Sequence, residues 1–155
     1  MEGRTHAFAE RGVQDRKGGR VLRLIARWFV VALYFVAGVA HLADPAPFLS
    51  IMPDWVPYPA AVVSWTGIAE LVGAIALAQW KSRDLQRAGA IGLALYAVCV
   101  FPANINHFAL DMGRPDQGLG LAYHVPRMVA QPLLVWLTLW AGRVIDWPFT
   151  RRTKV

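Results

Sequence analysis

Four long runs of apolar residues, separated by short polar segments, dominate the pattern of the chain. They cover about residues 24–43, 59–80, 88–110 and 127–146. Each run has about the 20 residues needed to cross the roughly 30 Å hydrocarbon core of a bilayer. Because a backbone in lipid must satisfy its own hydrogen bonds, each run is predicted to be a transmembrane α-helix. The pattern predicts an all-α membrane protein, built as an antiparallel four-transmembrane-helix bundle.

The predicted membrane domain covers residues 21–147 and lies between two basic tails. Residues 1–20 are polar, rich in Gly and Arg, and without apolar periodicity, so a mobile cytoplasmic tail is expected. Residues 148–155 are expected to form a second basic cytoplasmic tail. A secretory signal peptide competes for the first run, because Gly38 and Ala40 are spaced like a cleavage site. The long leader and the long apolar run favour a retained helix.

The segment between the first two runs, residues 44–58, is predicted to contain a short interfacial helix on the outer membrane surface. Asp44 can cap such a helix, and Pro45 suits its first position. Four apolar side chains then recur at helical spacing: Phe48, Ile51, Met52 and Trp55. Prolines in the second half of the segment are expected to end this helix.

The basic residues between the apolar runs predict the orientation of the chain. Residues 1–27 hold seven Lys and Arg, residues 81–87 hold three, and residues 143–155 hold four. Residues 44–58 hold none, and residues 111–127 hold two. Cytoplasmic segments of membrane proteins carry an excess of Lys and Arg. We therefore expect a multi-pass protein of the plasma membrane, the inner membrane where a cell has two, with both termini in the cytoplasm.

The composition removes several classes of protein. Of the 155 residues, 56% are hydrophobic and 17% are charged. Soluble domains carry about 25% charged residues, so an ordinary soluble enzyme is excluded. Cys99 is the only cysteine, which excludes an internal disulfide and a thiolate-rich metal site. The predicted topology accounts for the net charge of +6, so the lipid bilayer is the expected partner and nucleic acid is not.

Glu70 is the most informative polar residue, because it lies near the middle of the second apolar run. An ionisable group inside a membrane is energetically expensive and indicates a functional site by default. The alternative is a structural hydrogen bond that ties the second helix to a neighbour. Glu70 is expected to face the interior and to form a polar cluster with Asn104 and with Arg127, Gln131 or both.

Other polar residues gather in the outer half of the predicted membrane domain. Asn104 and His107 are three residues apart and share a helix face. Arg127 and Gln131 are four apart and share a face of the fourth run. Their alternative role is to satisfy a kinked backbone or to reach the headgroups. Six residues form the predicted ligand pocket, which opens to the outside: His41, Glu70, Asn104, His107, Arg127 and Gln131. Four glycines are expected to let the helices approach closely: Gly67, Gly73, Gly89 and Gly92.

Four sequence motifs occur in order along the chain: FVAGVAHLADPAPFLSIMPDWVP, SWTGIAELVGAIAL, FPANI and VPRMVAQ. Together they resemble the DoxX-like family of small four-helix membrane proteins, over roughly residues 28–140. The family pattern falls on these residues: Gly38, His41, Pro45, Phe48, Pro53, Gly67, Glu70, Pro102, Asn104, Arg127 and Gln131. The resemblance implies the four-helix fold. Members are linked to quinone-coupled sulfur oxidation, to assembly of redox enzymes, to oxidative-stress complexes and to receptor chaperoning.

The main functional prediction is a redox-associated membrane subunit whose pocket binds a quinone or a similar small carbonyl compound. Glu70 would exchange a proton, and Arg127 and Asn104 would donate hydrogen bonds. The chain has no nucleotide-binding motif and no thiol pair, so it is not expected to be a stand-alone enzyme, and a membrane or periplasmic redox partner is expected. Two alternatives stay open: a non-enzymatic scaffold or assembly factor, and a small proton-coupled transporter, for which a homo-oligomer could form the pore.

Metal and haem binding are a further alternative that the sequence does not favour. No cofactor is required by the sequence, and no metal is expected, because the histidine spacing matches no ligand motif. The three histidines that could act as ligands are His41, His107 and His124.

Overall fold

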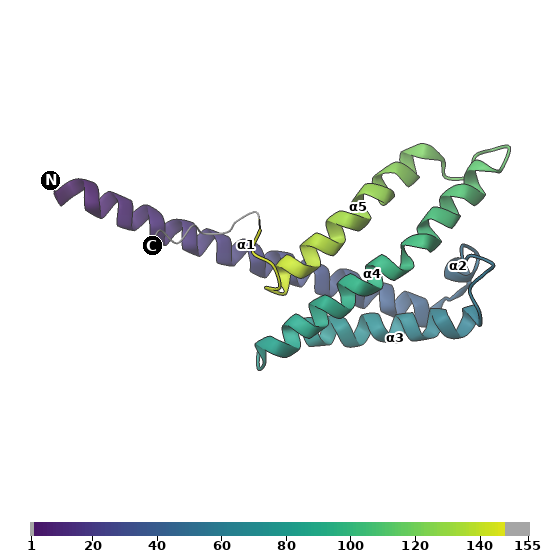
Figure 1. Cartoon of the computed structure of the whole chain (residues 1–155), viewed down its shortest axis with the longest axis horizontal. Helices are drawn as coiled ribbons and strands as arrows, with labels where there is room; N and C mark the ends of the chain where they lie inside the picture. The colour runs from purple at the N-terminus through teal and green to yellow at the C-terminus, as the bar shows by residue number, and fades with distance from the viewer. Residues whose placement is uncertain (1, 148–155) are drawn as a thin grey trace.

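The structure is a computed structural model that describes residues 2–147, with side chains from Gly18 onward. All the regular secondary structure in this described part is helical, without strands (Figure 1). Its five helices are α1 (Glu2–Ala43), α2 (Ala46–Leu49), α3 (Pro59–Ala78), α4 (Arg83–Met112) and α5 (Gly120–Ala141). The prediction of an all-α protein is confirmed. The predicted tail at residues 148–155 lies outside the described residues.

Each of the four long helices covers most of one predicted apolar run, but their ends differ from those predicted. α3 ends at Ala78 and α5 at Ala141, before the predicted residues 80 and 146. α1 begins at Glu2 rather than at residue 24, so one helix continues through the segment that was expected to be a tail. α5 begins at Gly120 rather than at residue 127. The added part of α1 is polar, so a search for apolar residues does not detect it, and the added part of α5, residues 120–126, includes Gly120 and Pro126, which are usually signs of a loop.

α4 has clear signals in the sequence at both ends. Ser82 is its N-cap, and the side-chain hydroxyl accepts a hydrogen bond from the backbone N–H of Leu85 at 3.2 Å. Asp84 lies in the first turn, where a negative charge suits the helix dipole. Gly113 ends the helix. Pro102 lies inside α4, where it removes one backbone hydrogen bond in the half of the helix that approaches the site.

The predicted surface helix within residues 44–58 is a single turn, α2 (Ala46–Leu49). Asp44 was expected to cap it, and this prediction is wrong, because Pro45 occupies the cap position and no side chain bonds the first turn. Turns and bends make up the rest of the segment. The prolines that were expected to end a longer helix instead keep it from forming.

The long helices meet at one end of the molecule and separate at the other. α1 and α4 each pack against both α3 and α5. The hydrophobic core lies toward the end opposite α2 and draws on all four helices: Ala26, Val30, Tyr34, Ala74, Leu77, Ala90, Leu93, Trp140 and Ala141. Toward α2, α4 and α5 lead away from α1 and α3 (Figure 1). The end near α2 is called the open end below.

Small residues bring the helices close together at several crossings. A Cβ atom added at Gly73 would lie 2.6 Å from the side chain of Leu93, and one at Gly89 would lie 2.8 Å from that of Ala76. Both glycines were predicted to allow close packing. Gly92 was predicted to do the same, but a Cβ atom there meets nothing within 4 Å, so this prediction is wrong.

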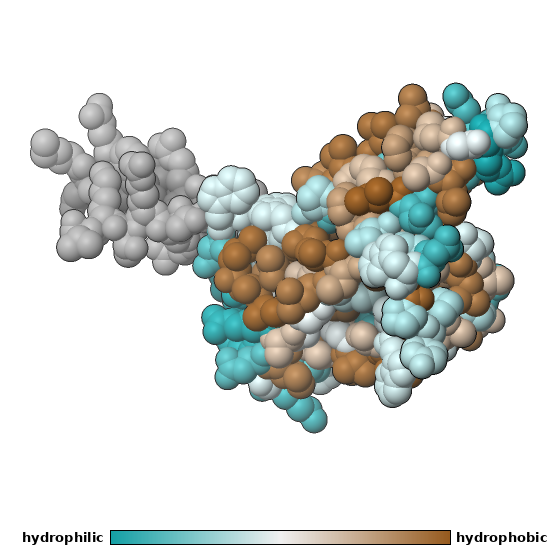
Figure 2. Space-filling model, turned by 45° about the vertical axis from the view of Figure 1, so that its right-hand side comes forward, coloured by the Kyte–Doolittle hydropathy of each residue, from teal (hydrophilic) through white to brown (hydrophobic). Residues whose placement is uncertain are grey.

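Three helical stretches are long and apolar enough to cross a membrane: Gly18–Ala43, Pro59–Ala78 and Arg83–Met112. No more than a third of each is buried, so large apolar side chains cover much of the surface. Figure 2 shows broad hydrophobic areas, with hydrophilic side chains gathered at the tip of the α4–α5 hairpin. Exposed apolar surface of this extent is compatible with a membrane protein. α5 is 22 residues long but less apolar, and it is not among the three stretches.

Candidate functional site

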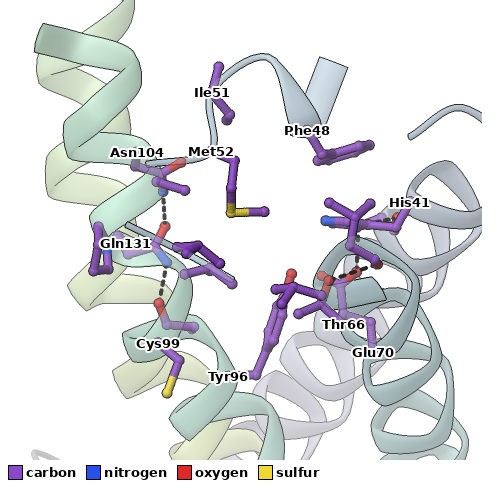
Figure 3. Close-up of a pocket in the computed structure, with 18 of the residues that line it drawn as sticks. His41, Phe48, Ile51, Met52, Thr66, Glu70, Tyr96, Cys99, Asn104 and Gln131 are labelled. Carbon is purple, nitrogen blue, oxygen red and sulfur yellow. Dashed lines mark hydrogen bonds and ion pairs between the residues drawn. The ribbon is translucent and has the colours of Figure 1, made fainter. Parts of the chain in front are cut away.

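A cavity of about 490 Å³ lies at the open end, where the helices separate (Figure 3). Its volume falls in the range of sites for small molecules, and most of its lining is apolar or aromatic, with a few polar groups. Five of the six residues predicted for the pocket line it: His41, Glu70, Asn104, Arg127 and Gln131. The sixth, His107, is not part of the lining, so its assignment to the cavity is wrong.

His41 on α1 and Glu70 on α3 form a buried pair on one wall of the cavity (Figure 3). Nδ1 of His41 lies 2.9 Å from Oε2 of Glu70 and 2.9 Å from the backbone oxygen of Ala37. A carbonyl oxygen only accepts hydrogen bonds, so Nδ1 carries a proton. Nε2 is therefore the nitrogen of His41 that is left for a ligand. Glu70 is 2% exposed, and its Oε2 has no hydrogen-bond partner in the described part of the chain, so the contact with His41 compensates this costly buried carboxyl as an ion pair when the imidazole is charged.

Two aromatic residues complete this wall. The ring of Phe48 stacks on the ring of His41, with centroids 3.7 Å apart and an interplanar angle of 23°. Tyr96 on α4 also lines the cavity, and its hydroxyl points toward the carboxyl of Glu70 (Figure 3). Tyr96 was not singled out from the sequence, where the available signal was a phenol inside an otherwise apolar run. The wall thus brings together His41, Glu70 and Tyr96, from three different helices.

Asn104 on α4 and Gln131 on α5 form a second pair on the opposite wall (Figure 3). Nδ2 of Asn104 donates a hydrogen bond to Oε1 of Gln131 at 2.8 Å. Nε2 of Gln131 donates to the backbone oxygen of Ala97 at 2.6 Å. Each amide thereby fixes the other, and Asn104 keeps one N–H and its own oxygen for other partners.

The two pairs lie across the cavity from each other, and among the described residues no hydrogen bond joins Glu70 to Asn104 or Gln131. The sequence predicted that they would form one cluster, and they form two. The position of a residue along a helix sets its depth in the molecule, whereas the rotation of each helix decides which side chains meet. Rotation depends on packing that the sequence pattern does not reveal.

Arg127 does not reach Glu70 either. Its NH1 lies 2.9 Å from Nδ1 of His107 and donates to the hydroxyl of Tyr123 at 3.1 Å. Its guanidinium lies 5.6 Å from the centre of the Tyr123 ring. Arg127 therefore lies at the border of the cavity, which it lines, and holds a histidine that lies outside it.

Asn106 holds the segment after α2 in place over the cavity. Its Nδ2 donates a hydrogen bond to the backbone oxygen of Ile51 at 3.1 Å. Ile51 and Met52 both line the cavity, and Asn106 does not. Asn106 therefore lies on a different face of α4 from Asn104, which lines the cavity.

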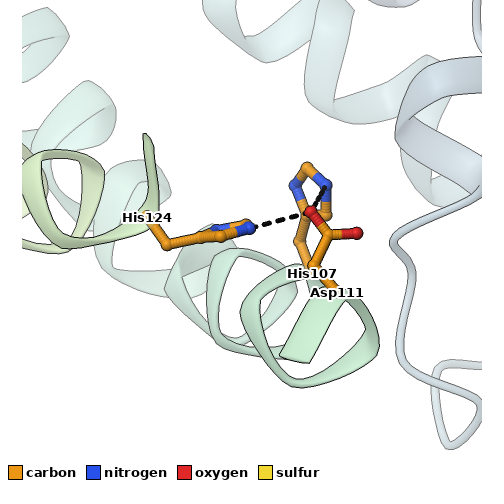
Figure 4. A group of neighbouring side chains, drawn as sticks. All are labelled: His107, Asp111 and His124. Atoms are coloured by element: carbon orange, nitrogen blue, oxygen red, sulfur yellow. Dashed lines mark hydrogen bonds and ion pairs between the residues drawn. The ribbon is translucent and has the colours of Figure 1, made fainter. Parts of the chain in front are cut away.

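A second group of polar residues, His107, Asp111 and His124, lies where α4 ends and α5 begins (Figure 4). Two of these are among the histidines named from the sequence, whereas His41 belongs to the cavity. Asp111 was missed, because the predicted third run ended at residue 110. The available signal was its spacing of four residues from His107, which places both on one face of a helix.

The arrangement of the cavity suits a small, flat molecule with polar groups at opposite edges. Hydrogen-bonding groups stand on two facing walls, and apolar side chains line the rest of the cavity between them. Nε2 of His41 can accept a proton when the imidazole is neutral and donate one when it is charged. The adjacent Glu70 carboxylate can compensate the positive charge of the imidazolium.

Residues 30–145, most of the chain, match a family described as "Domain of unknown function (DUF8561)". Both walls of the cavity and the His107–Asp111–His124 cluster lie within this matched range. No curated protein and no solved structure gives a significant match to the sequence. The family description names no activity, so any assignment of function depends on the chemistry of the site.

Proposed function

The chain belongs to the DUF8561 family, and we propose that it is a membrane subunit that binds a quinone, or a small carbonyl compound of similar shape, in the cavity at its open end. The observation that carries this proposal is the placement of two polar pairs on facing walls of an apolar cavity. A para-quinone ring has the complementary form, because it is flat and apolar with a hydrogen-bond acceptor at each end.

Each wall has a group for one quinone oxygen. Nδ1 of His41 is occupied by Ala37 and Glu70, so protonated Nε2 would donate to the first carbonyl. The second N–H of Asn104 would donate to the other, since its first is used by Gln131. Reduction of the quinone to a quinol takes two electrons, which a redox partner would supply, and two protons. Nε2 of His41 is placed to pass one proton to the first ring oxygen, and Glu70 would stabilise the charged imidazole beforehand. The second proton would come from water at the open end, because the Asn104 amide does not release one.

The membrane topology belongs to the same proposal. All four long helices would span the plasma membrane as an antiparallel bundle, with both termini in the cytoplasm and the open end toward the outer side. The 22 residues of α5 are long enough for a bilayer, and the basic residues favour this orientation. Kinship with the DoxX-like proteins is also proposed, on the four motifs quoted above, whose His41, Glu70, Asn104, Arg127 and Gln131 all line the cavity.

Binding of menadione, a para-naphthoquinone without a long tail, tests the proposal. Quinones quench tryptophan fluorescence, and Trp55 lines the cavity and can report binding. The full chain in detergent is titrated with menadione, as are the variants His41→Ala and Asn104→Ala. Each variant removes one donor to a carbonyl and should weaken binding about three- to tenfold, the value of one hydrogen bond.

Gln117→Ala is the control. It also deletes one side-chain amide, but at an exposed position in the loop between α4 and α5 that does not line the cavity, and it should leave the affinity for menadione within about twofold of wild type. If wild type shows no saturable quenching, or if all three variants weaken it equally, the quinone proposal is wrong. The chain is then better regarded as a non-enzymatic scaffold.

A further inference from the structure

The cluster of His107, Asp111 and His124 has the geometry of a metal site (Figure 4). One ligand atom from each residue lies within 4.8 Å of the other two. Oδ2 of Asp111 is 2.9 Å from Nε2 of His124 and 3.5 Å from Nε2 of His107. Two ligands at about 2.1 Å from one ion, at bond angles of about 90–109°, lie about 3.0–3.4 Å apart. The two separations that involve Asp111 lie within about 0.1 Å of this range, and the third, between the two histidine nitrogens, is at most 4.8 Å and would shorten when an ion binds.

We propose that this cluster binds one divalent transition-metal ion, with Zn²⁺ the best fit among common ions. Two imidazole nitrogens and one carboxylate oxygen are the ligand types that Zn²⁺ takes, and the set contains no soft sulfur ligand. Three protein ligands leave a fourth position open for water. The ion would join the end of α4 to the beginning of α5, and the site is separate from the cavity, so it does not depend on the function proposed above.

The surrounding chain holds the three residues in place before any ion arrives. His107 and Asp111 lie one turn apart on the same face of α4, and His124 approaches from α5. His124 is fully buried, and Asp111 is 5% exposed. The backbone N–H of Leu119 donates to Oδ2 of Asp111 at 3.0 Å, which is the kind of outer hydrogen bond that orients a ligating carboxylate.

Gly118 allows the connecting loop to close over the carboxylate. Its φ of +52° is one that glycine adopts readily, and a Cβ atom at this position would lie 2.3 Å from Cγ of Asp111. The loop can therefore cover Asp111 only with glycine here.

Arg127 sets a condition on metal binding. Its NH1 lies 2.9 Å from Nδ1 of His107, and a guanidinium only donates hydrogen bonds. In this arrangement His107 carries its proton on Nε2, the atom that faces Asp111. A metal bound to Nε2 requires the proton on Nδ1, so Arg127 must release His107. The ion and Arg127 therefore compete for His107, and ion binding would free a cationic side chain that also lines the cavity.

Metal titration of the full chain in detergent tests the proposal. The protein is stripped with EDTA and titrated with Co²⁺, whose visible absorption reports its coordination, and Zn²⁺ is then added as a competitor. Wild type should bind one equivalent. Asp111→Asn should weaken binding by at least about a hundredfold, more than the loss of a typical outer partner. Arg127→Gln should bind the ion about three- to tenfold more tightly, because one competing hydrogen bond is gone.

Asp116→Asn is the matched control, because it makes the same substitution in the neighbouring loop at an exposed carboxylate that pairs with Arg114. Its affinity for Co²⁺ should equal that of wild type. Circular dichroism is used to check whether each variant remains helical. The wild-type titration tests metal binding even if Asp111→Asn does not fold. The proposal is overturned if wild type shows no saturable Co²⁺ spectrum, or if Asp111→Asn and Asp116→Asn bind alike. The cluster would then be a hydrogen-bonded carboxylate–histidine group.

Discussion

Gly67 on α3 lies directly against His41 on α1, and a Cβ atom added at Gly67 would stand 2.8 Å from the Cβ atom of His41. It would also stand 3.1 Å from the backbone oxygen of Gly38. Such distances allow nothing larger than hydrogen between the helices. Glu70 follows Gly67 by less than one helical turn, so this crossing is what brings the carboxylate within reach of the histidine.

Gly67→Ala should therefore separate α1 from α3 and weaken the His41–Glu70 pair. We expect a loss of about 1–3 kcal/mol in the free energy of unfolding, typical of overpacking. Thermal unfolding in detergent, followed by circular dichroism, measures it. Gly92→Ala is the control, because a Cβ atom there meets nothing within 4 Å. It should be neutral or stabilise by up to about 1 kcal/mol, as alanine favours helix over glycine. Equal effects of both substitutions would contradict a close contact at Gly67.

The pairing of His41 with Glu70 makes a prediction about the coupling of their substitutions. Glu70→Gln and His41→Gln should each destabilise the protein, and the double variant should lose less than the sum, with a coupling of about 0.5–3 kcal/mol. Unfolding of the four proteins of this cycle in one detergent measures the coupling.

A second cycle supplies the comparison for this one. Glu70→Gln combined with Asn104→Ala joins residues from opposite walls that share no hydrogen bond among the described residues. These two effects should add within about 0.5 kcal/mol. A coupling as large as that of the His41 cycle would mean that the walls form one network, as the sequence had suggested.

The prediction from the sequence was strongest where one residue type decides the outcome locally. Runs of apolar residues located the long helices, because hydropathy is a property of each segment alone. Glu70 was expected to face the interior and is buried, because a carboxylate inside an apolar run is energetically expensive to expose to lipid. Asn104 was expected in the polar pocket and lines the cavity, because amides mark polar parts of a membrane helix.

The sequence was weaker wherever two helices decide the outcome together. His41, not Asn104, is the partner of Glu70. The close crossing of α1 and α3 at Gly67 brings these two side chains together. Asp111 was missed because the helix end was placed one residue too early. Tyr96 was missed because a tyrosine in an apolar run has no distinctive spacing. Each of these depends on helix rotation or exact helix ends, which packing determines.

The proposed topology predicts the location of three fusion points. Reporter fusions after Arg87 and after Arg152 should be cytoplasmic, and a fusion after Asp54 should be external, because the basic residues lie in the segments assigned to the cytoplasm. A pair of reporters, one active only inside and one only outside, measures each site. An external reporter after Arg152 would show that α5 does not cross the membrane and would contradict the four-span topology.

The loop between α4 and α5 allows a test that separates backbone strain from contact with Asp111. Gly118 and Gly120 both have positive φ, +52° and +71°, so alanine at either position is strained by about 1–2 kcal/mol. Only Gly118 faces the carboxylate of Asp111, whereas a Cβ atom at Gly120 meets nothing within 4 Å.

Gly118→Ala should therefore destabilise the protein by about 1–3 kcal/mol more than Gly120→Ala does, because it adds overpacking to the shared strain. Thermal unfolding of the two variants after treatment with EDTA measures this difference without any contribution from a bound ion. A repeat with Zn²⁺ should raise the melting temperature of wild type and of Gly120→Ala, and should raise that of Gly118→Ala less, since the displaced carboxylate no longer completes the ligand set. Equal stability of the two variants would show that the loop does not depend on close packing against Asp111.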